Sequence, residues 1–231
     1  MTYYLIAQST YADIELGIAI DGRIQGSTSV SKLEASSHIL VALGSLLKQH
    51  NLALSDLAFI AANSGPGPFT TLRVLLSTIN GLGYAAKIPL LGIDGLNAFL
   101  REHHSSNFAI TIALLNAFTN DVYYGIDDNG KVEIGCLNGH AFLESLQEKH
   151  PATKIRFIGS GLTPYKDLIQ KLFGSDAIIA DPLPPQSSLP YLAQQAYNHW
   201  LNKQNITDQI IPLYLKNQIN NIQVSTPFKA Q

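Results

Sequence analysis

A glycine- and proline-rich segment at residues 64–73, SGPGPFTTLR, directly precedes a long helical pattern and is the first candidate for chemistry. Such a segment can bind phosphate through backbone N–H groups at a helix start. A P-loop also needs a lysine that reaches the phosphates, and no lysine lies between Lys48 and Lys87. Proline removes further N–H groups, and Pro68 suits a first helical turn with Gly67 as its cap. The segment therefore favours a rigid corner that starts a helix, with an anion at the helix N-terminus as the alternative.

The helix predicted at 69–86 carries two apolar stripes at helical spacing. The bulky stripe consists of Leu72, Leu75, Leu76, Ile79, Leu82 and Ala86, and the small one of Val74, Thr78, Gly81 and Ala85. A surface helix of a monomer normally needs one such stripe. The second stripe indicates burial on two sides, either by the rest of this chain or by a partner subunit.

Other candidate groups give little support for catalysis. The seven histidines lack the spacing of a metal site, and His103-His104 reads as a solvated loop. Cys136, the single cysteine, has no close basic neighbour and favours packing over nucleophilic chemistry. Gly159 and Gly161 flank Ser160 between a strand and a helix, which is typical either of a nucleotide-binding turn or of an ordinary strand-to-helix turn.

The bulk composition sets limits on function. The chain has 231 residues, of which 46% are apolar and 14% charged, so it is a globular protein. A formal net charge of −2 argues against a broad nucleic-acid surface, which needs a basic face. We expect no signal peptide and no membrane helix, because no apolar run reaches about 18 residues. A cytoplasmic location is the expectation.

The predicted elements follow one order twice: three strands, a helix, a strand and a helix. The first round has strands at 3–7, 14–20, 23–30, 57–62 and 90–93 with helices at 36–50 and 69–86. The second has strands at 108–115, 122–127, 131–137, 155–159 and 177–180 with helices at 140–149, 163–173 and 188–203. This order predicts an α/β fold of two actin-like/Hsp70-like (ASKHA, RNase H-like) lobes, each a mixed sheet with helices. The expected lobes are 1–104 and 107–231, with the C-terminal tail able to pack back on the first.

Several segments together resemble the bacterial TsaB (YeaZ) family. They are the segment NSGPGPFTTLRVLLSTINGLGYAAKIPLLGIDGLNAF at 63–99, NDVYYG at 120–125, FIGSG at 157–161 and IPLYLKN at 211–217. The correspondence runs in order from residue 4 to about 217. The departures from the family pattern are Gln8 for Asp, Ala35 for His, Pro68 for Ser, Thr71 for Gly, Asn116 for Asp and Phe118 for Arg. Actin-like ATPases also usually have an acidic residue where Gln8 stands.

The resemblance implies a subunit without catalytic residues, metal or cofactor of its own. It would pair with the catalytic paralogue TsaD and support the ATPase TsaE in adding threonylcarbamoyl to adenosine of tRNA, which it meets only through the complex. ATP or ADP would bind only at the partner interface, apart from a weak nucleotide turn at Gly159 and Gly161. The first two helices would form a homodimer in isolation or the heterodimer. The expected interface residues are Ile39, Leu43, Leu46, Leu47, Thr70, Arg73, Val74, Ser77, Thr78, Gly81 and Ala85.

Two other functions remain open from the residues alone. An actin-fold ATPase or small-molecule kinase would use the same fold, although Gln8 cannot replace the usual carboxylate. A self-associating structural protein would use the two helices only to form homodimers.

Overall fold

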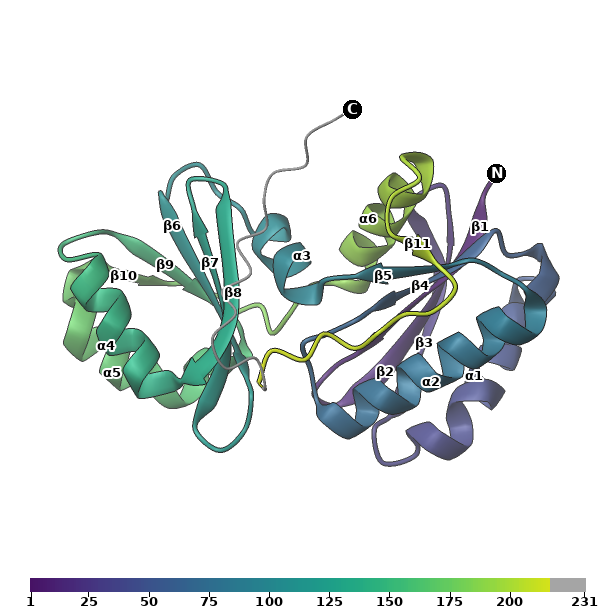
Figure 1. Cartoon of the computed structure of the whole chain (residues 1–231), viewed down its shortest axis with the longest axis horizontal. Coiled ribbons are helices and arrows are strands. Elements are labelled where there is room, and N and C mark those ends of the chain that lie inside the picture. Colours follow the sequence, from purple (N-terminus) through teal and green to yellow (C-terminus); the bar gives the residue numbers. More distant parts are fainter. Residues whose placement is uncertain (217–231) are drawn as a thin grey trace. The chain divides into compact units, whose positions relative to one another are not determined.

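The computed structural model describes residues 1–216; Asn217, the end of the expected tail motif, and the remaining residues to 231 lie outside this range. The chain forms two compact units (Figure 1). The first unit combines Met1–Ala98 with Ser187–Leu213, and the second contains Phe99–Gln186 and the described residues from Tyr214 to Lys216. Each unit is a mixed sheet covered by helices, as the sequence predicts.

The sheet of the first unit begins with an antiparallel meander of three strands: β1 (Tyr3–Ser9), β2 (Asp13–Ile20) and β3 (Arg23–Ser31). Then β4 (Phe59–Asn63) and β5 (Leu90–Ile93) add parallel to β1. A short strand that the sequence pattern did not reveal, β11 (Ile206–Thr207), closes the edge beside β5. The strand order is β11-β5-β4-β1-β2-β3.

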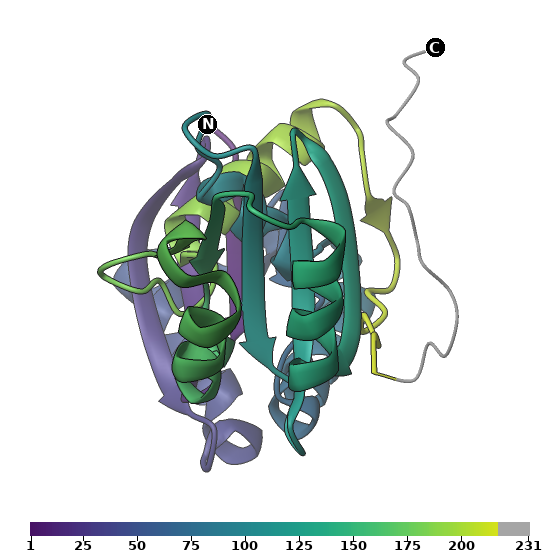
Figure 2. The same ribbon diagram turned by 90° about the vertical axis from the view of Figure 1, so that its left-hand side faces the viewer.

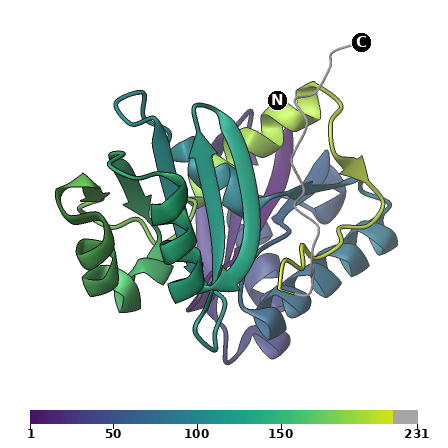
Figure 3. The same ribbon diagram turned by 60° about the vertical axis from the view of Figure 1, so that its left-hand side comes forward.

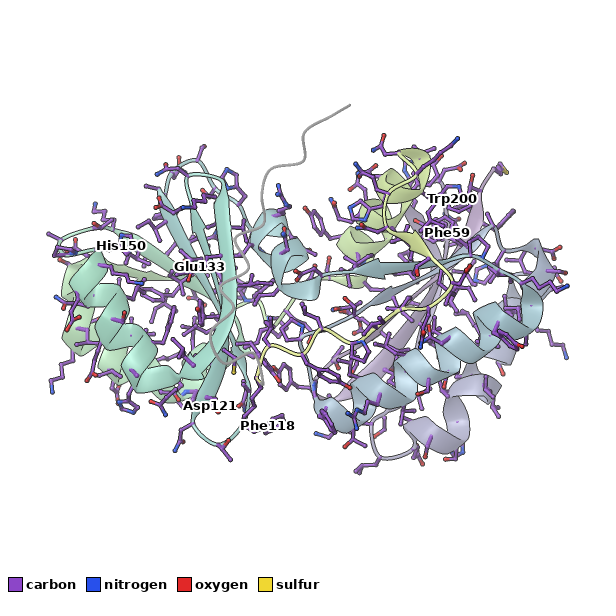
Figure 4. The ribbon with its side chains drawn as sticks, in the orientation of Figure 1. Phe59, Phe118, Asp121, Glu133, His150 and Trp200 are labelled. Atoms are coloured by element: carbon purple, nitrogen blue, oxygen red, sulfur yellow. The ribbon has the colours of Figure 1, made fainter. Side chains whose placement is uncertain are left out.

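Helices cover both faces of this first sheet (Figure 1). On one face lie α1 (Ala35–Gln49) and α2 (Phe69–Ala86), whose leucine-rich stripes pack on alternate residues of the strands. On the other face lies α6 (Leu189–Leu201), which packs through Leu189, Leu192, Ala193 and Ala196. The Phe59 ring stacks on that of Trp200 at 4.7 Å between centroids (Figure 4).

The position of α6 corrects the expected lobe boundaries. The sequence order placed the helix at 188–203 in the second lobe, whereas α6 belongs to the first unit. The physical reason is the apolar second face of the first sheet, which needs cover. Tyr4 on β1 stacks on Phe59 and donates its hydroxyl hydrogen bond to the Ala193 carbonyl of α6 at 2.8 Å.

The second unit repeats the plan of the first. Its sheet has the order β10-β9-β6-β7-β8, with β6 (Ile110–Asn116), β7 (Asp121–Asp128), β8 (Lys131–Asn138), β9 (Ile155–Ile158) and β10 (Ala177–Ile179). The helices α4 (Gly139–Lys149) and α5 (Lys166–Phe173) cover one face (Figure 2). The 3-10 segment Ser160–Tyr165 leads into α5, so the predicted helix at 163–173 is split.

One helix escaped the sequence analysis. The helix α3 (Gly95–Glu102) follows β5, and two N–H groups of its first turn, those of Leu96 and Asn97, donate to the Asp94 carboxylate at 3.0 Å each. Such a capping residue was the available sequence signal. Within residues 1–216, no helix has the length and apolarity required to cross a membrane.

Candidate partner interface and the altered polar site

The corner before α2 is held by hydrogen bonds on both sides. The backbone N–H of Gly65 donates to Asn63 Oδ1 at 2.8 Å, and the N–H of Leu213 donates to the Ser64 carbonyl at 2.8 Å. Gly65 has a φ of +116°, which L side chains rarely adopt. The residue that caps α2 is Pro68 rather than the expected Gly67. These features support the interpretation of this segment as a rigid corner.

The two stripes of α2 lie in different environments. Leu72, Leu75, Leu76 and Ile79 are buried against the sheet and α1, as their spacing predicts. The opposite side, which we call the outer face of α2, contains the expected interface residues. Thr70, Arg73, Ser77, Gly81 and Ala85 are exposed, and Val74 and Thr78 are half-buried. A Cβ atom at Gly81 would have no atom within 4 Å, so this part of the surface is open.

An exposed aromatic-basic pair marks the start of the outer face. Phe69 is the first residue of α2, and the Arg73 guanidinium lies over its ring at 3.7 Å from the centroid. Arginine and aromatic side chains are enriched at protein interfaces, where they contribute much of the binding energy. Phe69 is therefore a further candidate beside the interface residues that the sequence predicts on α2.

The expected interface residues of α1 need correction. Ile39, Leu43, Leu46 and Leu47 are buried in the core of the first unit and offer no surface to a partner. Their helical spacing reflects packing on the unit's own sheet. The exposed apolar residues of α1 are instead Leu40 and Val41, at 56% and 64% exposure.

The end of β1 has a polar arrangement that contains a carboxylate on the neighbouring strand. Gln8 is buried, and its amide nitrogen donates to Glu15 Oε2 at 2.6 Å and to the Ser187 carbonyl at 3.3 Å. Gln8 and Glu15 are directly paired in the β1–β2 register. A neutral amide thus occupies the position expected for an acid in the family pattern, and it binds the Glu15 carboxylate of the neighbouring strand.

The glycine turn at 159–161 is explained by close packing. A Cβ atom on Gly159 would lie 2.2 Å from the Leu114 carbonyl oxygen, and one on Gly161 would lie 2.7 Å from the Leu115 carbonyl carbon. Gly159 also has a φ of +104°. Both glycines are therefore required for the approach of this turn to β6, and nucleotide binding here stays a prediction.

The departures at 116 and 118 lie at the end of β6 and in the turn that follows it, respectively. Phe118, Thr119 and Asn120 all have positive φ, and the Asn116 side chain accepts a hydrogen bond from the Phe118 N–H at 2.8 Å. Lys216 of the tail donates to the carbonyls of Ala117 and Phe118 and to Thr119 Oγ1. It also forms an ion pair with Asp121 at 3.0 Å. The lysine of the tail motif therefore stabilises this turn.

Of the remaining titratable candidates, His104 has a carboxylate partner, and the other two are perturbed by burial. His104 Nδ1 lies 2.9 Å from Asp127 Oδ2, and burial lowers the pKa of His103. Burial also raises the pKa of the Cys136 thiol to about 11. Within the described part of the chain, no three His, Cys, Asp or Glu side chains are grouped so that they could hold a metal ion.

The sheet order and the repeated βββαβα plan place the chain among two-lobed actin-like α/β proteins. A family model described as "TsaD: tRNA N6-adenosine threonylcarbamoyltransferase" matches residues 29–222, and the chain belongs to this family. The resemblance of the sequence to TsaB (YeaZ) proteins is confirmed by individual relatives.

Three relatives define that similarity. The chain is 26% identical over 211 residues to the Haemophilus influenzae tRNA threonylcarbamoyladenosine biosynthesis protein TsaB, covering 83% of this chain and 85% of that one. It is 26% identical over 207 residues to TsaB of Bacillus subtilis, with 84% and 88% covered. The structure of YeaZ from Pseudomonas aeruginosa superposes with a TM-score of 0.68 at 21% identity, covering 93% of this chain and all of that one, and supports the fold.

Proposed function

We propose that this protein is a non-catalytic subunit in the biosynthesis of threonylcarbamoyladenosine in tRNA. In this proposal it dimerises with the catalytic paralogue TsaD, activates it and supports TsaE. The names of its relatives support the pathway. The main structural support is the outer face of α2, which exposes small residues and an Arg73–Phe69 pair while its opposite side is buried.

The neutral end of β1 supports an accessory role over an ATPase or kinase. The Gln8 side chain is a neutral amide, and it donates a hydrogen bond to the Glu15 carboxylate of β2. An ATPase or kinase of this fold would instead need a carboxylate at position 8. Mg-dependent ATP turnover by the isolated protein would contradict the non-catalytic role.

The interface can be tested with bulky substitutions on α2. Ala85→Arg and Gly81→Arg should abolish formation of the heterodimer with the TsaD of the same organism, measured by size-exclusion chromatography with light scattering. Ala141→Arg on α4 is a matched control, because Ala141 is also an exposed helical alanine. An intact heterodimer with both α2 variants would show that another face binds the partner.

The cellular role needs a separate measurement. Depletion of the protein should lower threonylcarbamoyladenosine in tRNA, measured by mass spectrometry of tRNA nucleosides. Unchanged levels would refute the pathway assignment.

A self-associating homodimer is the second candidate for the same face. The exposed Leu40 and Val41 of α1 favour it, since apolar side chains on a helix next to α2 extend the surface that a second copy could cover. Sedimentation of the isolated protein, with and without TsaD, separates the two: a homodimer that TsaD does not dissociate would support this second candidate.

A further inference from the structure

An open pocket lies in the first unit where α2 ends and β5 begins. Its volume is about 740 Å³. Its lining includes Tyr84, Ala85 and Lys87 at the end of α2, Ile88 and Pro89 in the connection to β5, and Asp208. No motif in the sequence pointed to this pocket, because Asp208 is separated from α2 by more than a hundred residues.

Asp208 is placed by a segment that we call the strap, residues 206–213. On one side of Asp208, Thr207 pairs with Leu90 of β5. On the other side, Asn80 of α2 donates to the Ile210 carbonyl at 2.9 Å and accepts from the Ile210 N–H at 2.8 Å. The strap therefore runs beside α2 (Figure 3), and Asp208 is fixed between two anchored residues.

The electrostatics of the pocket favour a cation. The C-terminal end of an α-helix carries a partial negative charge, and α2 ends at this pocket. The Asp208 side chain is exposed, and within residues 1–216 no ion pair engages its carboxylate. Among the described residues that line the pocket, the one opposing charge is Lys87, which lies just beyond the last turn of α2.

The apolar part of the lining favours a long side chain with a flat cationic group. Tyr84 is 88% exposed, so its ring face is available to a guanidinium. Ile88 and Pro89 provide an apolar wall for a methylene stem. Arginine combines these properties, since its guanidinium stacks on aromatic rings and pairs with carboxylates.

The pocket is continuous with the outer face of α2. Ala85 belongs to both, and Gly81 lies one turn earlier on the same side of the helix. A subunit that docks on α2 would therefore cover the pocket as well. We propose that this pocket receives an arginine side chain of the subunit that docks on the outer face of α2. This inference rests on the proposed function, since the docking subunit is the TsaD of the same organism.

Asp208 and Lys87 carry opposite charges, so neutralising each of them should change the affinity for the partner in opposite directions. The binding constant of the full-length chain for TsaD is measured by isothermal titration calorimetry. Asp208→Asn should weaken binding about tenfold, because it removes the carboxylate that pairs with the arginine. Lys87→Gln should strengthen binding about threefold, because it removes a repelling cation. Tyr84→Ala should weaken binding while Tyr84→Phe preserves it, because the ring face makes the contact.

Matched controls lie on the second unit. Glu148→Gln and Lys149→Gln on α4 make the same charge changes on exposed residues and should leave the binding constant unchanged. Circular dichroism melting of each variant checks that the fold is intact.

Four results would overturn the inference. Unchanged affinity for the Asp208 and Lys87 variants would show that the pocket is not part of the interface. Reversed signs would show that an anionic group occupies it. Loss of binding in Gly81→Arg with unchanged Asp208→Asn would refute the pocket alone and leave the proposed function intact, whereas no binding by the unaltered chain would overturn both.

Discussion

Gln8 and Glu15 face each other across β1 and β2, with the Gln8 amide nitrogen 2.6 Å from Glu15 Oε2. The family pattern has an aspartate at position 8, so two carboxylates would share this site if the pattern were kept. Side chains directly opposite in antiparallel strands are close neighbours, and like charges there destabilise the sheet. The glutamine and the glutamate therefore form a compatible pair, and Glu15 explains why a neutral amide suits position 8.

Gln8→Asp should lower the free energy of unfolding by about 1–3 kcal/mol at pH 7.5. Two adjacent carboxylates would share one proton, so the pKa of the pair in the folded variant would lie above that in the unfolded chain. The folded state would then bind more protons, and its stability would rise as pH falls through that raised pKa. Urea unfolding at pH 4.5 and 7.5 measures the difference.

The control for this prediction is the double variant Gln8→Asp/Glu15→Gln, which restores one carboxylate and one amide and should recover most of the stability. Equal losses in the single and the double variant would show that the shape of residue 8, and not charge, decides stability.

Asn63 and Gly95 form a second matched pair. A Cβ atom on Gly95 would lie 2.3 Å from Asn63 Oδ1, the atom that accepts the Gly65 N–H hydrogen bond. Gly95→Ala should therefore displace the Asn63 side chain and cost about 1–3 kcal/mol in unfolding free energy, the cost of leaving a buried N–H without its acceptor. Chemical denaturation of Gly95→Ala, Asn63→Ala and the double variant gives a thermodynamic cycle. Additive losses would contradict the coupling.

Gly159 provides a test of the packing explanation for the glycine turn. Gly159→Ala brings a Cβ atom to 2.2 Å from the Leu114 carbonyl oxygen at a φ of +104°, so we expect a loss of several kcal/mol or failure to fold. Gly130→Ala is the matched control, since Gly130 also has positive φ but has no neighbour within 4 Å. It should cost about 1 kcal/mol. Similar melting temperatures of the two variants would refute the packing explanation.

The fold was predictable where local pattern decides structure. The bulky stripe of α2 has helical spacing and is buried, and the hairpin β2–β3 follows from strand-like runs separated by Asp21-Gly22. The same rule predicts burial of Ile39 and Leu43 on α1, which the family resemblance instead placed at the interface. Apolar spacing shows that a helix has a buried face, and only the packed structure shows what covers it.

Long-range relationships could not be predicted. Tyr4 and Ala193 are joined by a hydrogen bond, and Asn80 bonds Ile210, but no local pattern connects such distant residues. For that reason the sequence assigned α6 to the wrong unit and gave no sign of the strap or of its pocket. The pairing of Gln8 with Glu15 needed the strand register, which sequence alone leaves open.

Cys136 offers a test of the environment at the end of β8. Burial, together with the nearby Asp121 carboxylate, raises the pKa of its thiol to about 11, and Lys216 opposes this shift. The thiolate fraction at pH 8 should then be about a hundredfold lower than for an ordinary cysteine. We expect the alkylation rate of the folded protein to rise with a midpoint near pH 11, and alkylation in urea to be about a hundredfold faster at pH 8.

Asp121→Asn should move the midpoint of Cys136 alkylation in the folded protein to lower pH, because a nearby negative charge disfavours the thiolate. Asp128→Asn, at the opposite end of β7, should leave this midpoint unchanged. Equal rates in the folded and unfolded protein would contradict the partial burial of the thiol.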